Sequence, residues 1–210
     1  MVMFKHLFPI LLLLAGIGLA STAQAELIDR AFAVYDTVSH LSWLKDANYA
    51  QTSGYDADGQ MTWADANTWA NGLTVGGFTG WRLPTALNAD GSGPCGPGYN
   101  CTTSELGYLY YTDGGLSQGQ NITSSAVLSG LFSNMQNFVY WSGTEYAPNP
   151  NNAWYFSTGY GDQYYYYEYN NFYAWAVRSG DVAAVPEPGV MGLLGIGALA
   201  WAGTKARRRG

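Results

Sequence analysis

Two apolar segments, each flanked by positive charge, bracket this 210-residue chain and leave a centre that must fold by itself. Of the nine Lys and Arg residues, Lys5 lies beside the first apolar segment and four more lie within residues 205–209, after the last one. The centre keeps four bases: Arg30, Lys45, Arg82 and Arg178. The chain carries fifteen Asp and Glu residues, so the centre is strongly acidic. A surface so poor in bases cannot neutralise phosphates, which excludes ordinary nucleic-acid binding.

The composition is that of an ordered domain. The chain is 16% aromatic and 11% charged, whereas about a quarter of the residues of an average globular domain are charged. A stretch this aromatic can bury a core, which excludes intrinsic disorder. Without its two ends the chain has about 160 residues, the size of one domain. We assign this domain to residues 26–182.

Residues 1–25 have the layout of a secretory signal peptide. Lys5 precedes an apolar run over residues 7–20, and Ala23-Gln24-Ala25 has the small-residue pattern of a cleavage site. The alternative is a membrane anchor, which needs about 20 apolar residues, more than this run supplies. We therefore expect an exported domain that folds where disulfides can form.

Residues 183–210 carry three parts in order. Pro186-Glu187-Pro188 is followed by an apolar stretch over residues 189–204 and by the basic cluster 205–209. This layout is typical of a stop-transfer helix held by cytoplasmic positive charge, and it closely resembles the PEP-CTERM sorting signal of Gram-negative bacteria. The resemblance implies transient anchoring in the inner membrane, processing by an exosortase and the secretion machinery, and delivery to the cell surface or extracellular matrix. A plain C-terminal membrane anchor is the alternative.

The pattern of the centre indicates an α+β fold, with two helices packed on a mostly antiparallel twisted sheet and a hydrophobic helix at each terminus of the chain. Thr62 and Asp65 form a capping-box-like pair before a helix that ends at Asn71-Gly72, and a second helix is expected after Thr102. Residues 159–162 are expected to link two strands as a hairpin. Runs typical of strands occupy residues 27–35, 41–44, 138–142, 153–158, 163–169 and 173–179.

Four motifs occur in an order that closely resembles the Lcl C-terminal domain family. They are Trp-Ala-Asp-Ala at 63–66, Gly-Trp-Arg-Leu-Pro-Thr at 80–85, Tyr-Trp-Ser-Gly-Thr-Glu at 140–145 and Tyr-Ala-Trp-Ala-Val-Arg at 173–178. The second motif is shared with formylglycine-generating enzymes. The resemblance implies a C-type-lectin-like fold and a bacterial surface setting; one relative is the adhesive end of a collagen-like adhesin that binds sulfated glycans. It implies no shared ligand, because this fold hosts unrelated functions.

The residues of these motifs are expected to build structure. Pro84 holds the chain extended, so Trp81 and Leu83 are expected to enter the core while Arg82 points the other way. Planar guanidinium groups suit fixed pairing, so Arg82 and Arg178 are interpreted as anchors on a carboxylate or on backbone carbonyls. Binding of an anionic substrate is the alternative. The structural motif residues are Trp81, Arg82, Pro84, Trp141, Trp175 and Arg178.

Groups that could carry catalysis are scarce in the centre. His40 stands alone, with no second His or Cys at ligand spacing, so neither a transition-metal site nor a Ser-His-Asp triad is expected. Paired carboxylates stay open as an alternative. Glu105, Glu145 and Glu168 nevertheless have ordinary places in a helix turn, a loop and a strand. We expect no catalytic residue and no enzyme.

Cys95 and Cys101 are the two cysteines of the chain, and in an exported protein they are expected to form a disulfide. The alternative is the copper-binding cysteine pair of formylglycine-generating enzymes, which is expected later in the chain. Asp56 and Asp58 begin like a calcium-binding loop, but Asn67 stands where the bidentate Glu belongs. We expect no cofactor, with calcium kept open as a loop stabiliser.

The tyrosine-rich run of residues 159–173 is the strongest candidate for binding. Strand alternation places two rows of side chains on opposite faces, and one row of rings is expected to be accessible. Rigid tyrosines with neighbouring Asn and Gly are typical of adaptable binding surfaces; the alternative is an ordinary ladder of cross-strand pairs. The expected ligand-binding residues are Tyr160, Asp162, Tyr164, Tyr166, Glu168, Asn170 and Asn171.

The sequence therefore predicts an exported, non-enzymatic binding or adhesion domain at the cell surface or in the matrix, with polysaccharide or another surface component as its ligand. A self-associating structural matrix protein is the first alternative, and an enzyme of the formylglycine-generating type is the second. No nucleic-acid partner is expected. The excess of acids fits a neutral or cationic partner, or a calcium bridge, better than a sulfated glycan.

Overall fold

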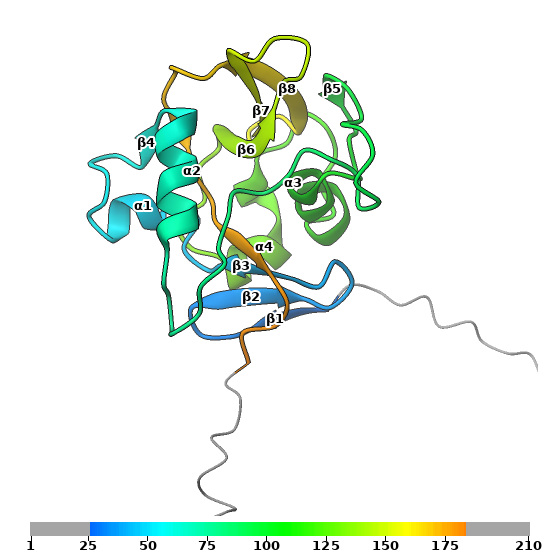
Figure 1. Cartoon of the computed structure of the whole chain (residues 1–210). Helices are drawn as coiled ribbons and strands as arrows, with labels where there is room; N and C mark the ends of the chain where they lie inside the picture. The colour runs from blue at the N-terminus through cyan, green and yellow to red at the C-terminus, as the bar shows by residue number, and fades with distance from the viewer. Residues whose placement is uncertain (1–25, 184–210) are drawn as a thin grey trace, which may run out of the picture.

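The computed structural model describes residues 26–183 (Figure 1). The predicted signal peptide, the predicted apolar helix of residues 189–204 and the sorting motif at residues 186–188 lie outside the described residues. Within residues 26–183, no helix is long and apolar enough to cross a membrane. This part of the chain is α+β, as predicted, with two sheets and a few short helices.

The smaller sheet joins the two ends of the described chain and is antiparallel throughout. Its order is β1 (Leu27–Asp29), β2 (Ala33–Asp36), β3 (Leu41–Leu44) and β10 (Val177–Ser179). The prediction of a single strand over residues 27–35 is wrong. Asp29 Oδ1 accepts the Ala31 N–H at 3.0 Å, and Ala31 adopts a left-handed φ of 67°. The chain therefore turns back after β1 and forms a hairpin.

The larger sheet lies above the smaller one in Figure 1. Its order is β4 (Gln60–Met61), β9 (Phe172–Tyr173), β6 (Val139–Glu145), β7 (Asn152–Ser157), β8 (Asp162–Tyr167) and β5 (Gly98–Tyr99). All neighbours are antiparallel except β6 and β9. The predicted hairpin at residues 159–162 is confirmed, because β7 pairs with β8. The predicted strand 173–179 is divided between β9 and β10, and the buried residues 174–176 cross from one sheet to the other.

Both predicted helices are present, and each begins after a capping side chain. α2 (Trp63–Gly72) follows Thr62, whose Oγ1 accepts the Asp65 N–H. α3 (Glu105–Tyr108) follows Ser104, and it continues as a π-helical turn, η1 (Leu109–Asp113). Three further short helices were not predicted: α1 (Tyr49–Thr52), the 3-10 turn η2 (Ile122–Ser124) and α4 (Ala126–Leu131).

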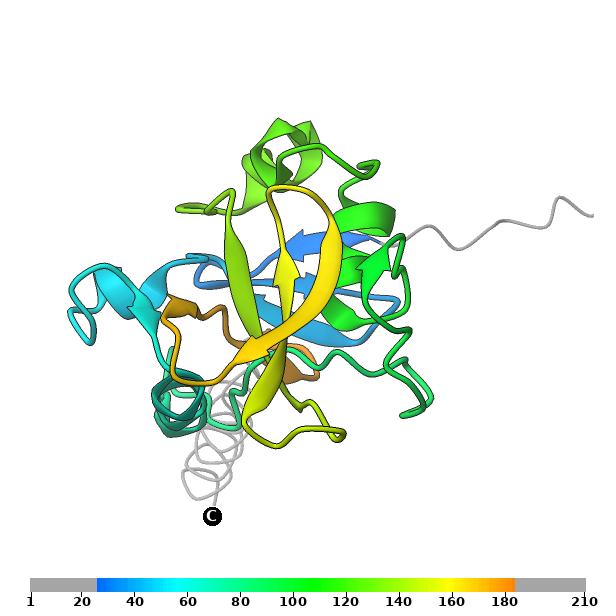
Figure 2. The same ribbon diagram turned by 90° about the horizontal axis from the view of Figure 1, so that it is seen from above.

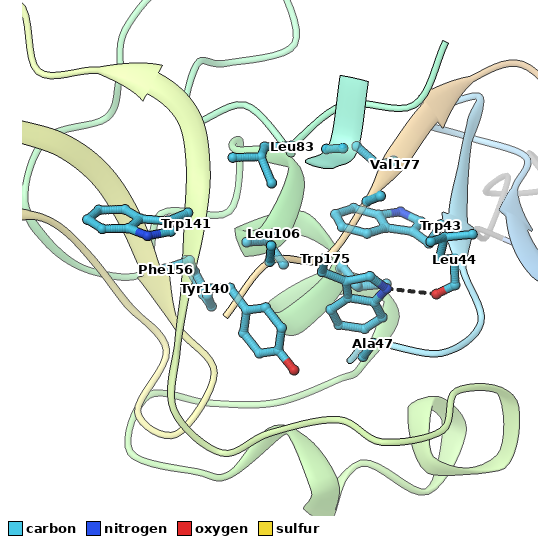
Figure 3. Packing of buried hydrophobic residues seen from close by; sticks show 14 of the residues in the cluster. Trp43, Leu44, Ala47, Leu83, Leu106, Tyr140, Trp141, Phe156, Trp175 and Val177 are labelled. Carbon is cyan, nitrogen blue, oxygen red and sulfur yellow. Dashed lines mark hydrogen bonds between the residues drawn. The ribbon is translucent and has the colours of Figure 1, made fainter. Parts of the chain in front are cut away.

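The core is built around four tryptophans that are at most 1% exposed: Trp43, Trp81, Trp141 and Trp175. Trp175 Nε1 donates to the Leu44 carbonyl at 2.7 Å, and its ring meets Trp43 edge-on with centroids 5.4 Å apart (Figure 3). Trp141 Nε1 donates to the Met61 carbonyl at 2.9 Å. Each indole thus buries a large apolar surface while its N–H is satisfied. These contacts fix the crossing segment against β3, and β6 against β4.

Candidate binding surface on the six-stranded sheet

The register of β7 with β8 decides which tyrosines face away from the core. Gln163 stands opposite Phe156, and both are 1% exposed, so this row looks into the molecule. Tyr164 stands opposite Tyr155, and Tyr166 stands opposite Ala153. Tyr164 and Tyr166 follow Gln163 by one and three residues, so their side chains lie on the other face of the sheet, which looks outward. In Figure 2, which is seen from above, β7 and β8 lie in front of the smaller sheet. The predicted pairing of Tyr164 and Tyr166 on one face thus agrees with the register.

The outward row belongs to a larger aromatic surface that centres on Phe172. The ring centroid of Phe172 lies 5.4 Å from that of Tyr155, 6.0 Å from Tyr166 and 6.4 Å from Phe138. Phe138, Tyr164 and Tyr166 are between 43% and 51% exposed. Phe138, Tyr155 and Phe172 were not predicted as site residues. We call this set the outer aromatic face: Phe138, Tyr155, Tyr164, Tyr166 and Phe172.

The second row of tyrosines also reaches solvent. Tyr165 is half-buried and stacks on Tyr146, with ring centroids 3.6 Å apart and ring planes 11° apart. Tyr167 and Tyr169 are 46% and 73% exposed. Tyrosines of both rows are therefore accessible, whereas the sequence predicted one accessible row. β5 pairs only with residues 162–163. From Tyr164 onward, β8 is therefore an edge of the sheet within the described chain.

Carboxylates border the outer aromatic face at both ends of β8. Asp162 begins the strand, and burial together with the charge of Asp162 raises the pKa of Tyr155 to about 12. Glu168 follows Tyr166 by two residues, and its Oε1 is buried without a hydrogen-bond partner. Burial first, and then the charge of Glu145, raises the pKa of Glu168. Both effects disfavour the ionised form of Glu168.

The remaining predicted binding residues lie apart from this face. Tyr160 is 63% exposed in the turn before β8, where its carbonyl accepts the Gly119 N–H. Asn170 and Asn171 follow the other end of the strand, and Asn170 Nδ2 donates to the Tyr167 carbonyl at 3.1 Å. The length of β8 separates these two groups. The structure therefore brings together Tyr164, Tyr166 and Glu168, and it leaves Tyr160 and the two asparagines at opposite ends.

The four central bases are all engaged. Arg30 pairs with Asp181 at 2.6 Å, Lys45 with Asp29 at 2.5 Å and Arg82 with Glu105 at 2.6 Å. Arg178 Nε donates to the Thr79 carbonyl at 3.2 Å, and its guanidinium lies 5.2 Å from the centroid of the Phe78 ring. Both motif arginines thus hold the fold together, Arg82 on a carboxylate and Arg178 on a carbonyl.

The aspartates that begin like a calcium loop form a closed turn. Asp56 Oδ1 accepts the N–H groups of Asp58 at 3.0 Å and Gly59 at 2.7 Å. Among residues 26–183, no three His, Cys, Asp or Glu side chains come together as a metal site. The lone His40 is placed with its Nδ1 3.1 Å from the Tyr35 hydroxyl. Asp56 is thus engaged by backbone N–H groups of its own loop.

The predicted disulfide between Cys95 and Cys101 is present, with Cα atoms 5.9 Å apart. Gln163 Nε2 contacts Cys95 Sγ at 3.6 Å, so the disulfide loop lies against the start of β8. A sulfur in a disulfide carries no thiolate for copper. The pair in this state is a structural link.

A hollow of about 410 Å³ is lined by residues outside the outer aromatic face. Leu41, Leu87 and Tyr108 contribute its apolar walls. The one carboxylate that lines it is Glu105, which is already held by Arg82 and by the Thr85 N–H. The hollow therefore offers apolar surface, and its one carboxylate is already engaged.

Comparison with known proteins identifies the C-terminal segment. Residues 184–209 match the PEP-CTERM protein-sorting motif. No curated protein matches the chain. The predicted resemblance of residues 183–210 to this signal is thus confirmed. The chain carries a PEP-CTERM sorting signal, which marks it as an exosortase substrate that is exported and sorted to the cell envelope.

Proposed function

We propose that residues 26–182 form a non-enzymatic binding domain of the Lcl C-terminal type, with a C-type-lectin-like fold, which holds polysaccharide at the surface or in the matrix of a Gram-negative cell. The observation that carries the proposal is the outer aromatic face. Flat, partly exposed rings stand side by side around Phe172 on an exported domain. Rigid amphipathic rings give a large contact area at little entropic cost, and sugar rings present flat apolar faces to such surfaces.

The cysteine chemistry supports a binding role over an enzyme of the formylglycine-generating type. An enzyme of that type needs two thiols to bind copper, whereas Cys95 and Cys101 are joined to each other in a disulfide. The one carboxylate that lines the hollow, Glu105, is already held by Arg82. Binding therefore accounts for the surface without any catalytic group.

The edge of β8 favours one second candidate function, self-association in the matrix. The backbone from Tyr164 to Tyr167 has no strand on its outer side within the described chain. Free strand edges pair with other chains. A second copy that adds a strand here would assemble the protein without any sugar.

Retention on immobilised exopolysaccharide from the producing bacterium tests the proposal. We expect the full chain, purified in mild detergent, to be retained with or without calcium. The double variant Tyr164→Ala/Tyr166→Ala is expected to lose at least about tenfold in affinity, the effect of truncating anchors at the centre of a contact surface. Tyr55→Ala is the matched control, because Tyr55 is 55% exposed outside this face.

Two results would decide against the proposal. Wild-type protein that is not retained, with and without calcium, would remove the polysaccharide claim. Concentration-dependent assembly in sedimentation velocity that added sugar leaves unchanged would favour the self-associating alternative.

A further inference from the structure

We infer that the outer aromatic face selects a cationic polysaccharide, one built of amino sugars with free amines, over neutral or sulfated chains. The inference rests on the proposed function and names the ligand class for the same surface. It is carried by charge complementarity between the rim of the face and the ligand.

The rim places two carboxylates beside the exposed rings. Glu145 pairs with Ala153, which in turn pairs with Tyr166, so Glu145 lies on the same side of the sheet as that ring, two strands or about 10 Å away. Glu168 lies in the turn directly after β8, where its N–H donates to the Asn151 carbonyl at 3.0 Å. Glu145 is exposed, and Glu168 is half-buried with no partner for Oε1. A ligand that lies along Tyr164 and Tyr166 therefore has two acidic residues at the rim of the face.

No base offsets this charge among the described residues. Fourteen of the fifteen acids lie within residues 26–183, the exception being Glu187, against four bases. Three of those bases are held in ion pairs. The fourth, Arg178, belongs to β10 in the smaller sheet and is held by carbonyls. A sulfated or uronic chain on this face would meet repulsion without one compensating cation.

A primary ammonium group supplies what the rim lacks. It brings three hydrogen-bond donors and a positive charge to carboxylates that have neither. The same charge is attracted to the face of an exposed tyrosine ring, such as Tyr166. An N-acetylated sugar keeps the ring contacts but loses both attractions. The difference between the two forms therefore isolates the charge selection from general sugar binding.

The test compares a glucosamine oligomer with its fully N-acetylated counterpart of equal length, and with dextran sulfate, by calorimetric titration of the full chain in mild detergent. We expect the free-amine oligomer to bind about tenfold more tightly than the acetylated one, the effect of one good charge pair. Added salt is expected to weaken the free-amine binding most, because salt screens charges. Dextran sulfate is expected not to bind.

Charge-neutral variants locate the effect. Glu168→Gln and Glu145→Gln are each expected to remove most of the amine preference, measured as the ratio of the affinities for the two oligomers. Glu26→Gln is the matched control, since Glu26 is an exposed acid at the start of β1 in the other sheet. An equal loss in Glu26→Gln would show non-specific attraction and overturn the inference.

The outcomes separate this inference from the proposed function. Equal binding of both oligomers that still depends on Tyr164 and Tyr166 would leave the proposed function standing and refute charge selection. Preferential binding of dextran sulfate would also refute it. Failure to bind either oligomer or the native exopolysaccharide would refute both.

Discussion

Arg82 and Glu105 form a two-pronged ion pair that ties the chain after Gly80 to the start of α3. Arg82 Nη1 donates to Glu105 Oε2 at 2.7 Å, and Nη2 donates to Oε1 at 2.6 Å. The Thr85 N–H shares Oε2 at 2.7 Å. Both carboxylate oxygens are thus occupied, and the segment between the two residues is closed into a loop that carries the disulfide.

Replacing Arg82 by Lys is expected to lower the free energy of unfolding by about 2 kcal/mol, because an ammonium cannot form both bonds and one charged hydrogen bond is lost. Lys45→Met removes the more exposed ion pair to Asp29 and is expected to cost about 0.5 kcal/mol or less. Urea unfolding of the full chain measures both. Equal losses of unfolding free energy in the two variants would contradict the larger contribution predicted for the two-pronged Arg82–Glu105 pair.

Trp175→Phe is expected to destabilise the protein by about 3 kcal/mol, since it removes buried volume and leaves the Leu44 carbonyl without its donor. Trp69 provides the matched control: it is 3% exposed, but its Nε1 has no partner. Trp69→Phe loses volume without losing a hydrogen bond, so it is expected to cost about 1–2 kcal/mol less. Thermal unfolding tests the order, and a larger loss at Trp69 would refute it.

Opening the disulfide is expected to cost about 2 kcal/mol, the loop-closure entropy of so short a ring. The double variant Cys95→Ser/Cys101→Ser, measured without reductant, is expected to unfold at the same urea concentration as the reduced wild type. Reductant added to the double variant serves as the control and is expected to change nothing. An oxidised wild type that is no more stable than the variant would show that the link leaves the fold unaffected.

Stability is expected to fall as the pH rises from about 4 to about 8, because Asp113 has no hydrogen-bond partner for either carboxylate oxygen. Burial, with the charge of Asp36 second, raises the pKa of Asp113 to about 8. The folded protein therefore holds a proton that the unfolded chain releases near pH 4, so the folded state is penalised as the pH increases through this window.

Asp113→Asn isolates this effect. We expect the variant and the wild type to melt alike near pH 4 and the variant to be more stable at pH 8, by about 1–3 kcal/mol after allowance for partial exposure. Melting curves between pH 4 and pH 9 provide the measurement. A variant that is less stable than the wild type at pH 8 would contradict the predicted raised pKa.

Features that depend on neighbouring residues in the chain were predictable from the sequence. The cap at Thr62, the hairpin at residues 159–162 and the disulfide between Cys95 and Cys101 each follow from local chemistry. Alternation within β8 also placed Tyr164 with Tyr166 correctly.

Features set by tertiary packing were not predictable. Phe172 joins the outer aromatic face because β9 pairs in parallel with β6. No local sequence pattern predicts that pairing. The division of residues 173–179 between two sheets follows from burial of the crossing segment around Trp175. The raised pKa of Asp113 likewise follows from packing, first from burial and then from the charge of Asp36, which is distant in sequence. Tyr155 is the exception, because it lies between Trp154 and Phe156 in a predicted strand, and neighbouring strand residues point to opposite faces.

Tyrosine nitration, mapped by mass spectrometry on the full chain with and without bound polysaccharide, tests the central claim most directly. We expect saturating ligand to slow nitration of Tyr164 and Tyr166 severalfold while Tyr55, which is 55% exposed elsewhere, reacts as before. Unchanged reactivity of Tyr164 and Tyr166 in protein that demonstrably holds the polysaccharide would show that the ligand binds elsewhere and would contradict the assignment of the outer aromatic face.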